Sequence, residues 1–150
     1  MLEVNYGIIG VGKTYHAVVN TIISSLQQGY RVFTNIKLDY DYIREIHGDI
    51  VDFVYYMTDF KGVVPCDGAV FVIDEFTHTK LSLSYFKCFK QNKDSHVLIL
   101  SQRYKHGDLP LSDFNYHITR FNFFGFKGYM STKRFFPYLF KSENFKMFLS

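Results

Sequence analysis

The sequence is poor in the residues that build covalent or metal-held frameworks. Its 150 residues include two cysteines, Cys66 and Cys88, which lie far apart and form no CxxC pair. This spacing indicates reduced thiols and argues against a disulfide scaffold or a zinc site. The chain also has three prolines, no tryptophan and no low-complexity stretch. Nothing in it is typical of a linker, so a single domain is expected.

Long apolar runs are absent too. No stretch approaches the ~20 consecutive apolar residues that cross a bilayer, and the start at Met1-Leu2-Glu3 does not open a secretory signal. We therefore expect a cytoplasmic chain. Hydrophobic residues make up 47% and charged residues 21% of the sequence, which favours a folded protein over a disordered one.

Charge and aromatic residues are distributed unevenly. From His117 onward there are six basic residues and one acidic residue, whereas the first 116 residues have eleven basic and thirteen acidic ones. We interpret residues 1–130 as one domain and residues 131–150 as a basic, aromatic tail. Three roles are open for this C-terminal region: packing as a hairpin, contact with single-stranded DNA or a coat protein, and contact with a membrane.

Predicted strands alternate with predicted helices. The apolar runs 69–73 and 97–100 are typical of strands buried on both faces. Other strands are expected at 2–6 and 31–34, and helices at 15–26, with a stop at Gly29, at 40–47 and at 81–90. A terminal hairpin is expected at 116–130, split by Gly125. This order predicts an α/β fold, a mostly parallel sheet with helices on both faces. Ligands of such sheets bind at the carboxyl ends of the strands.

A glycine-rich motif follows the first predicted strand. Residues 7–14, Gly-Ile-Ile-Gly-Val-Gly-Lys-Thr, match the phosphate-binding pattern G-x-x-x-x-G-K-[ST] of P-loop NTPases. Glycines allow several backbone N–H groups to face one anion, and the helix that follows directs its positive end there. We expect Lys13 to reach the β- and γ-phosphates of ATP and the Thr14 hydroxyl to bind Mg²⁺. The predicted nucleotide contacts are Gly7, Gly10, Val11, Gly12, Lys13, Thr14 and Tyr15.

Two further polar groups follow buried strands. Asp74 and Glu75 come directly after the run 69–73. A carboxylate at that position can hold Mg²⁺, which we assign to Asp74, and a second can act as general base, which we assign to Glu75. Gln102 follows the other buried strand and would point at the γ-phosphate if that strand lay between the two motif strands. The predicted catalytic residues are Lys13, Glu75 and Gln102.

These motifs occur in a recognisable order. The phosphate loop, Phe33-Thr34-Asn35-Ile36, Val72-Ile73-Asp74-Glu75 and Leu98-Ile99-Leu100-Ser101-Gln102 follow one another as in the zonular occludens toxin (Zot-like) family. The sequence resembles that family over roughly residues 1 to 120, and the family is related to the FtsK/HerA group of DNA-pumping ATPases. The resemblance implies an oligomeric ATPase that acts in filamentous virion assembly and export. It implies functional roles for Lys13, Thr14, Asp74, Glu75 and Gln102.

The resemblance also implies partners and alternatives. Expected partners are further copies of the chain, phage coat or assembly proteins, and single-stranded DNA, on the cytoplasmic side of the host membrane. The family usually has a membrane-spanning helix after the ATPase domain. This chain lacks it, so we expect either a fragment or indirect membrane attachment. The alternatives are a viral DNA-packaging ATPase and a nucleotide-binding scaffold without efficient turnover.

Overall fold

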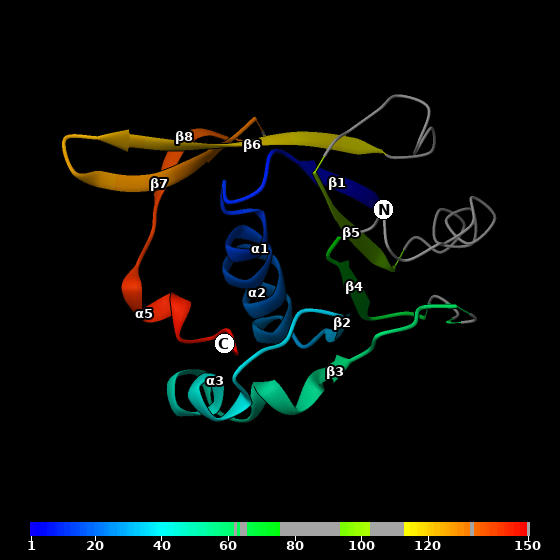
Figure 1. Cartoon of the computed structure of the whole chain (residues 1–150). Helices are drawn as coiled ribbons and strands as arrows, with labels where there is room; N and C mark the ends of the chain where they lie inside the picture. Colours follow the sequence, from blue (N-terminus) through cyan, green and yellow to red (C-terminus); the bar gives the residue numbers. More distant parts are fainter. Residues whose placement is uncertain (62, 64–65, 76–93, 103–112, 133, 150) are drawn as a thin grey trace.

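A single sheet organises the molecule. The computed structural model describes residues 1–61, 63, 66–75, 94–102, 113–132 and 134–149. Within them, eight strands form one sheet in the order β3-β2-β4-β5-β1-β6-β7-β8 (Figure 1). The strands are β1 Leu2–Tyr6, β2 Arg31–Thr34, β3 Val54–Tyr56, β4 Ala69–Ile73, β5 His96–Ser101, β6 Phe114–Phe123, β7 Phe126–Ser131 and β8 Arg134–Leu139.

Most of the sheet is parallel. All neighbours from β3 to β6 run in the same direction, whereas β6–β7 and β7–β8 are antiparallel pairs. The predicted α/β architecture with a mostly parallel sheet is therefore confirmed. Strand β5 lies between β1 and β4, with Tyr6 opposite Ser101 and Ile73 opposite Ile99. This order brings the chain segments after β1, β4 and β5 to one edge of the sheet.

One long helix follows β1 and has three consecutive segments. These are α1 Lys13–His16, η1 Ala17–Ile22 and α2 Ile23–Gln27. The middle segment is π-helical, a departure from α-helical periodicity that is frequent at functional sites. Gly29 follows with a φ of 84°, in agreement with the predicted helix stop. The remaining described helices are α3 Tyr40–His47, η2 Gly48–Phe53 and α5 Ser142–Phe145.

The sheet separates two hydrophobic cores. Val70 and Val72 of β4 face the α1–α2 helix, whereas Phe71 and Ile73 face the opposite side. Strand β4 is thus buried on both faces, as its continuous apolar run predicts. Helices η1, α2, α3 and η2 contribute to the first core, and the second contains Phe60 from the connection after β3. The predicted helix 81–90, the candidate for the second face, lies outside the described residues.

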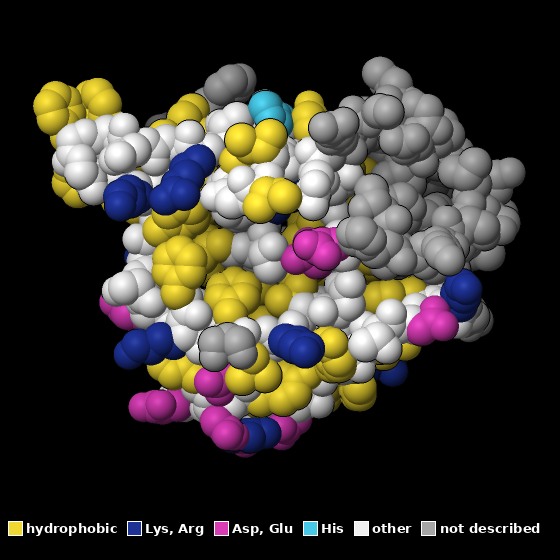
Figure 2. Space-filling model, viewed as in Figure 1, with side chains coloured by type: hydrophobic (Ala, Val, Ile, Leu, Met, Phe, Trp, Pro, Cys, Tyr) yellow, Lys and Arg dark blue, Asp and Glu magenta, His cyan; other side chains and the backbone are white. Residues whose placement is uncertain are grey.

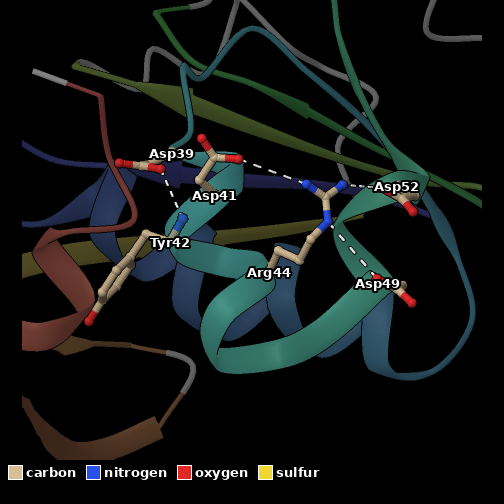
Figure 3. Close-up of polar contacts among 6 residues, drawn as sticks. All are labelled: Asp39, Asp41, Tyr42, Arg44, Asp49 and Asp52. Atoms are coloured by element: carbon tan, nitrogen blue, oxygen red, sulfur yellow. Dashed lines mark hydrogen bonds and ion pairs between the residues drawn. The ribbon is translucent and has the colours of Figure 1, made fainter.

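Polar contacts fix the start of α3 and its junction with η2. The Tyr42 backbone N–H donates to Asp39 Oδ1 at 3.0 Å, which caps the helix (Figure 3). Figure 3 also shows the Arg44 guanidinium among the carboxylates of Asp41, Asp49 and Asp52. These ion pairs are solvent-exposed, so we expect them to orient η2 and to contribute little to stability.

The C-terminal region is a ribbon followed by a returning segment. The predicted hairpin is confirmed: β6 and β7 meet at a two-residue turn in which Phe124 and Gly125 both have positive φ, 47° and 81°. Strand β8 extends this ribbon, and α5 leads the chain back towards α3 (Figure 1). Met147 is 3% exposed within the first core, and its carbonyl accepts from the Asp39 N–H at 2.8 Å.

This packing changes the view of residues 131–150. The sequence suggests a separable tail, whereas β8 is part of the sheet and Met147 part of the core. Among the described residues, no helix has both the length and the apolar character needed to span a bilayer.

Candidate nucleotide-binding site

The glycine-rich loop connects β1 to α1 and is closely covered by the C-terminal ribbon. A Cβ atom on Gly7 would lie 2.4 Å from the Ile118 carbonyl oxygen of β6, so only glycine fits there. Gly12 has a φ of 101°, and a Cβ there would lie 2.9 Å from the Phe140 ring. Gly7 is thus required because β6 approaches closely, and Gly12 because of both the nearby Phe140 ring and its backbone conformation. The approach of an anion to the backbone would be a further reason for glycine in this loop.

Lys13 lies inside the loop. Its Nζ donates hydrogen bonds to the carbonyl oxygens of Gly7 at 2.7 Å and Ile8 at 2.9 Å. Burial lowers the pKa of the Lys13 ammonium, and the nearby carboxylates of Asp74 and Glu75 oppose that shift. The loop therefore holds a desolvated cation at its centre, where it can attract an anion strongly.

Thr14 and Asp74 form the link between the loop and β4. The Thr14 hydroxyl donates to Asp74 Oδ2 at 2.8 Å. Burial raises the pKa of Asp74, and the hydrogen bond from Thr14 acts in the opposite direction. A hydroxyl and a carboxylate this close provide the hard oxygen ligands that Mg²⁺ prefers, so the pair fits the predicted cation.

Asn35 holds the backbone of Asp74 from the neighbouring strand β2. Its side-chain Nδ2 donates to the Asp74 carbonyl at 2.8 Å, and its Oδ1 accepts from the Asp74 N–H at 2.7 Å. This paired contact aligns the ends of β2 and β4. Asn35 is thus a positioning residue, and the signal for it in the sequence is its place directly after a β-rich run.

Glu75 and Gln102 complete a small cavity. Glu75 is exposed with a φ of 51°, an uncommon conformation for a residue other than glycine. A cavity of about 100 Å³ is lined by side chains from the ends of β4 and β5 and from the loop: Ile9, Gly10, Lys13, Thr14, Asp74, Glu75, Leu100, Ser101 and Gln102. The structure therefore brings together Lys13, Thr14, Asp74, Glu75 and Gln102.

Two predicted contact residues have buried side chains. Val11 is 4% exposed and packs with Ile118 and Tyr129 under the ribbon, so its side chain faces away from the loop's open side. Tyr15 is 5% exposed, and its hydroxyl accepts from the Lys141 N–H at 3.0 Å and Asn144 Nδ2 at 2.9 Å. The Tyr15 side chain anchors the C-terminal segment, and only its backbone is available to a phosphate.

A larger cavity adjoins the other side of the loop. It has a volume of about 370 Å³ and is lined by Gly10, Gly12, Lys13, Thr14, Tyr15, Arg120, Phe140, Phe145 and Phe148. Sequence reasoning missed the three phenylalanines as site residues. The available signal is the density of aromatic residues after position 134, for which the sequence leaves packing, partner contact and membrane contact open.

A buried polar group, the Tyr129 hydroxyl, joins the helix to the ribbon. The Tyr129 hydroxyl accepts from Asn20 Nδ2 at 2.6 Å and lies 3.1 Å from His16 Nδ1. Burial raises the pKa of Tyr129, so the hydroxyl stays protonated. Asn20 lies in the π-helical segment η1. The helix therefore departs from α-helical geometry at the residue that contacts Tyr129 of β7.

Comparison with known proteins assigns the family. The family model of zonular occludens toxin (Zot) matches residues 1–99, which include the loop, Asn35, Asp74 and Glu75. A search of curated proteins gives no match. The family is associated with phages and with ATPase-like proteins, whereas the relation to the FtsK/HerA group stays a prediction. The chain belongs to the zonular occludens toxin (Zot) family.

Proposed function

We propose that this chain is a P-loop ATPase that binds ATP with Mg²⁺, hydrolyses it and acts in the assembly or export of filamentous virions. One observation carries the proposal: a cation, a hydroxyl, two carboxylates and an amide from distant parts of the sequence line one cavity beside the glycine-rich loop. Membership of a phage-associated, ATPase-like family supports the biological setting.

The loop and Lys13 would bind the phosphates. Backbone N–H groups of the loop face the anion, and the positive end of the α1–α2 helix adds to their attraction. Lys13 would exchange its two loop carbonyls for phosphate oxygens. Thr14 and Asp74 would hold Mg²⁺, which when bound neutralises charge on the β- and γ-phosphates.

Glu75 would activate the attacking water. Its exposed carboxylate lines the small cavity and can take a proton from water as the water oxygen bonds to the γ-phosphorus. The bond from that phosphorus to the bridging oxygen breaks, and ADP and phosphate leave. Gln102 would orient the water or the γ-phosphate from the end of β5.

The lining of the small cavity favours an oligomer. Among the described residues that line it, Lys13 is the one cationic side chain, although phosphoryl transfer commonly uses an arginine to stabilise transition-state charge. A neighbouring copy of the chain could supply that arginine. A scaffold that binds ATP without turnover is the competing proposal; it needs the loop, Lys13 and the Thr14–Asp74 pair but no proton transfer to Glu75.

Hydrolysis measured across protein concentration separates these proposals. Specific activity should rise with concentration if a second copy completes the site, and DNA added at fixed concentration tests the packaging alternative. ATP binding without hydrolysis at any concentration would favour the scaffold. Absence of ATP binding would remove the proposal.

A further inference from the structure

The larger cavity is continuous with the glycine-rich loop. Gly10, Lys13 and Thr14 line both this cavity and the small one. The loop therefore has two sides, one with acidic and amide side chains and the other with aromatic side chains. Figure 2 shows hydrophobic side chains gathered at the surface over α1 and the segment that leads into α5.

The aromatic wall is held in place by Tyr15. The Phe140 and Phe145 ring centroids lie 5.0 Å and 4.9 Å from that of Tyr15. The Tyr15 hydroxyl accepts the hydrogen bonds from Lys141 and Asn144 on either side of the α5 start. The rings are thus presented by a fixed segment, and Phe145 remains 49% exposed.

The two cavities beside the loop indicate how a bound nucleotide would be oriented. A γ-phosphate near Glu75 and Gln102 leaves the α-phosphate and sugar to pass over the loop toward Thr14 and Tyr15. The cavity of about 370 Å³ then lies where the base would be, and its size falls within the range of small-molecule sites. Arg120, which also lines this cavity, would add positive charge beside the bound nucleotide.

We propose that this cavity is the nucleobase subsite, where the base of the bound nucleotide packs against Phe140, Phe145 and Phe148. This inference rests on the proposed ATP site and extends it, because it makes the C-terminal segment part of the nucleotide-binding surface. Two features identify a nucleobase as the occupant. The cavity shares loop residues with the proposed phosphate site, and every base has a π-face that stacks on an aromatic ring.

Removal of one stacking ring should weaken base binding selectively. Alanine substitution of an aromatic partner costs ~1–3 kcal/mol per stacked base. We therefore expect Phe145→Ala to lower the affinity for ATP about tenfold and to leave the affinity for tripolyphosphate, which has no base, unchanged. Phe53→Ala is the matched control because Phe53 is 51% exposed on η2, outside the residues that line the cavity.

The lack of tryptophan allows a direct optical test. Phe145→Trp places one indole in a chain that otherwise has none. If a base stacks there, titration with Mg²⁺ and ATP should quench the indole emission, whereas tripolyphosphate should bind with little change in emission. Phe53→Trp provides the control and should respond to neither ligand. Isothermal titration of the same variants measures binding independently of fluorescence.

The outcomes separate the two proposals. Quenching by ATP alone, with a selective loss of ATP affinity in Phe145→Ala, supports the base subsite. Equal responses to ATP and tripolyphosphate, or unchanged ATP affinity in Phe145→Ala, would overturn it while the phosphate site stands. If neither ligand binds to the unmodified chain by titration calorimetry, the ATP site itself is wrong and the subsite falls with it.

Discussion

The two sides of the loop are built in different ways. On the side of the small cavity, Asp74 and Gln102 each follow a strand directly, and Lys13 follows β1 after the glycine-rich loop, so the order of three parallel strands is enough to bring them together. On the aromatic side, Phe140, Phe145 and Phe148 are placed by a chain segment that crosses from the ribbon to α3. The first side depends on local motifs and the second on long-range packing. The residues beside the small cavity can thus be brought together by short motifs, whereas the aromatic wall depends on the whole domain.

Truncation gives the largest expected effect on this comparison. A chain stopped at Met130 loses β8, Phe140 and the core residue Met147. We expect it to be insoluble or to melt at a much lower temperature, with no measurable ATP binding. Met147→Ala in the full chain should cost ~2–5 kcal/mol and retain ATP binding at low temperature. A soluble truncated chain with unchanged ATP affinity would show that residues 131–150 are a separable tail.

Lys13→Ala should affect ligand far more than fold. We expect ATP affinity to fall about 100-fold or more, because charge-assisted hydrogen bonds to phosphate are lost. The melting temperature should decrease only modestly, since two loop carbonyls lose their donor. Lys37→Ala, at an exposed lysine, is the matched control. Calorimetric titration with Mg²⁺ and ATP measures the difference, and equal affinity in both variants would refute the role of Lys13.

The convergence of Lys13, Asp74 and Gln102 beside the loop can be predicted from the sequence for a physical reason. A glycine pattern, a buried strand and a following carboxylate are all local properties, and the parallel order then makes their positions converge. Four of the predicted strands, the helix stop at Gly29 and the hairpin turn at Gly125 are confirmed. The three-residue strand β3 and the strand β8 were missed, because their pairing partners, and not their own patterns, define them. The roles of Val11 and Tyr15 were also missed, because burial under the ribbon cannot be read from the loop.

Asp74→Asn should weaken binding that depends on Mg²⁺. We expect about a tenfold loss of ATP affinity in Mg²⁺ and little change in EDTA, because an amide is a weaker ligand for a hard cation. Burial raises the pKa of Asp74, so acidification should protonate it at a higher pH than an ordinary Asp and weaken Mg²⁺-dependent binding there.

The raised pKa of Asp74 also changes how the stability of the fold depends on pH. The unfolded chain releases the Asp74 proton at a lower pH than the folded chain, so the ionised side chain destabilises the fold as pH rises through that interval. Asp74→Asn removes this cost and should melt at an equal or higher temperature without ligand at neutral pH. A clearly lower melting temperature would contradict the assignment of a carboxylate that is destabilised by burial and directed at a ligand.

Tyr129→Phe should give the smallest effect and test how the two sides are joined. Loss of the hydroxyl leaves Asn20 and His16 without that buried partner, which should cost ~1–3 kcal/mol of unfolding free energy. ATP affinity should remain within about threefold, a shift of well under 1 kcal/mol. Denaturant titration checks the first value, with Tyr55→Phe at a 42% exposed tyrosine as the control. Equal stability of the two variants would show that the group does not hold the ribbon.

The most direct test of the central claim is paired measurement of ATP binding and hydrolysis in Glu75→Gln. The substitution keeps the side-chain shape and removes the proton acceptor. We expect an ATP affinity within about twofold of the unmodified chain and a turnover rate reduced ~100-fold or more. Glu45→Gln, at an exposed glutamate on α3, should leave both quantities unchanged. Hydrolysis at the unmodified rate in Glu75→Gln would contradict the account, because the cavity beside the loop would then not be the place where water is activated.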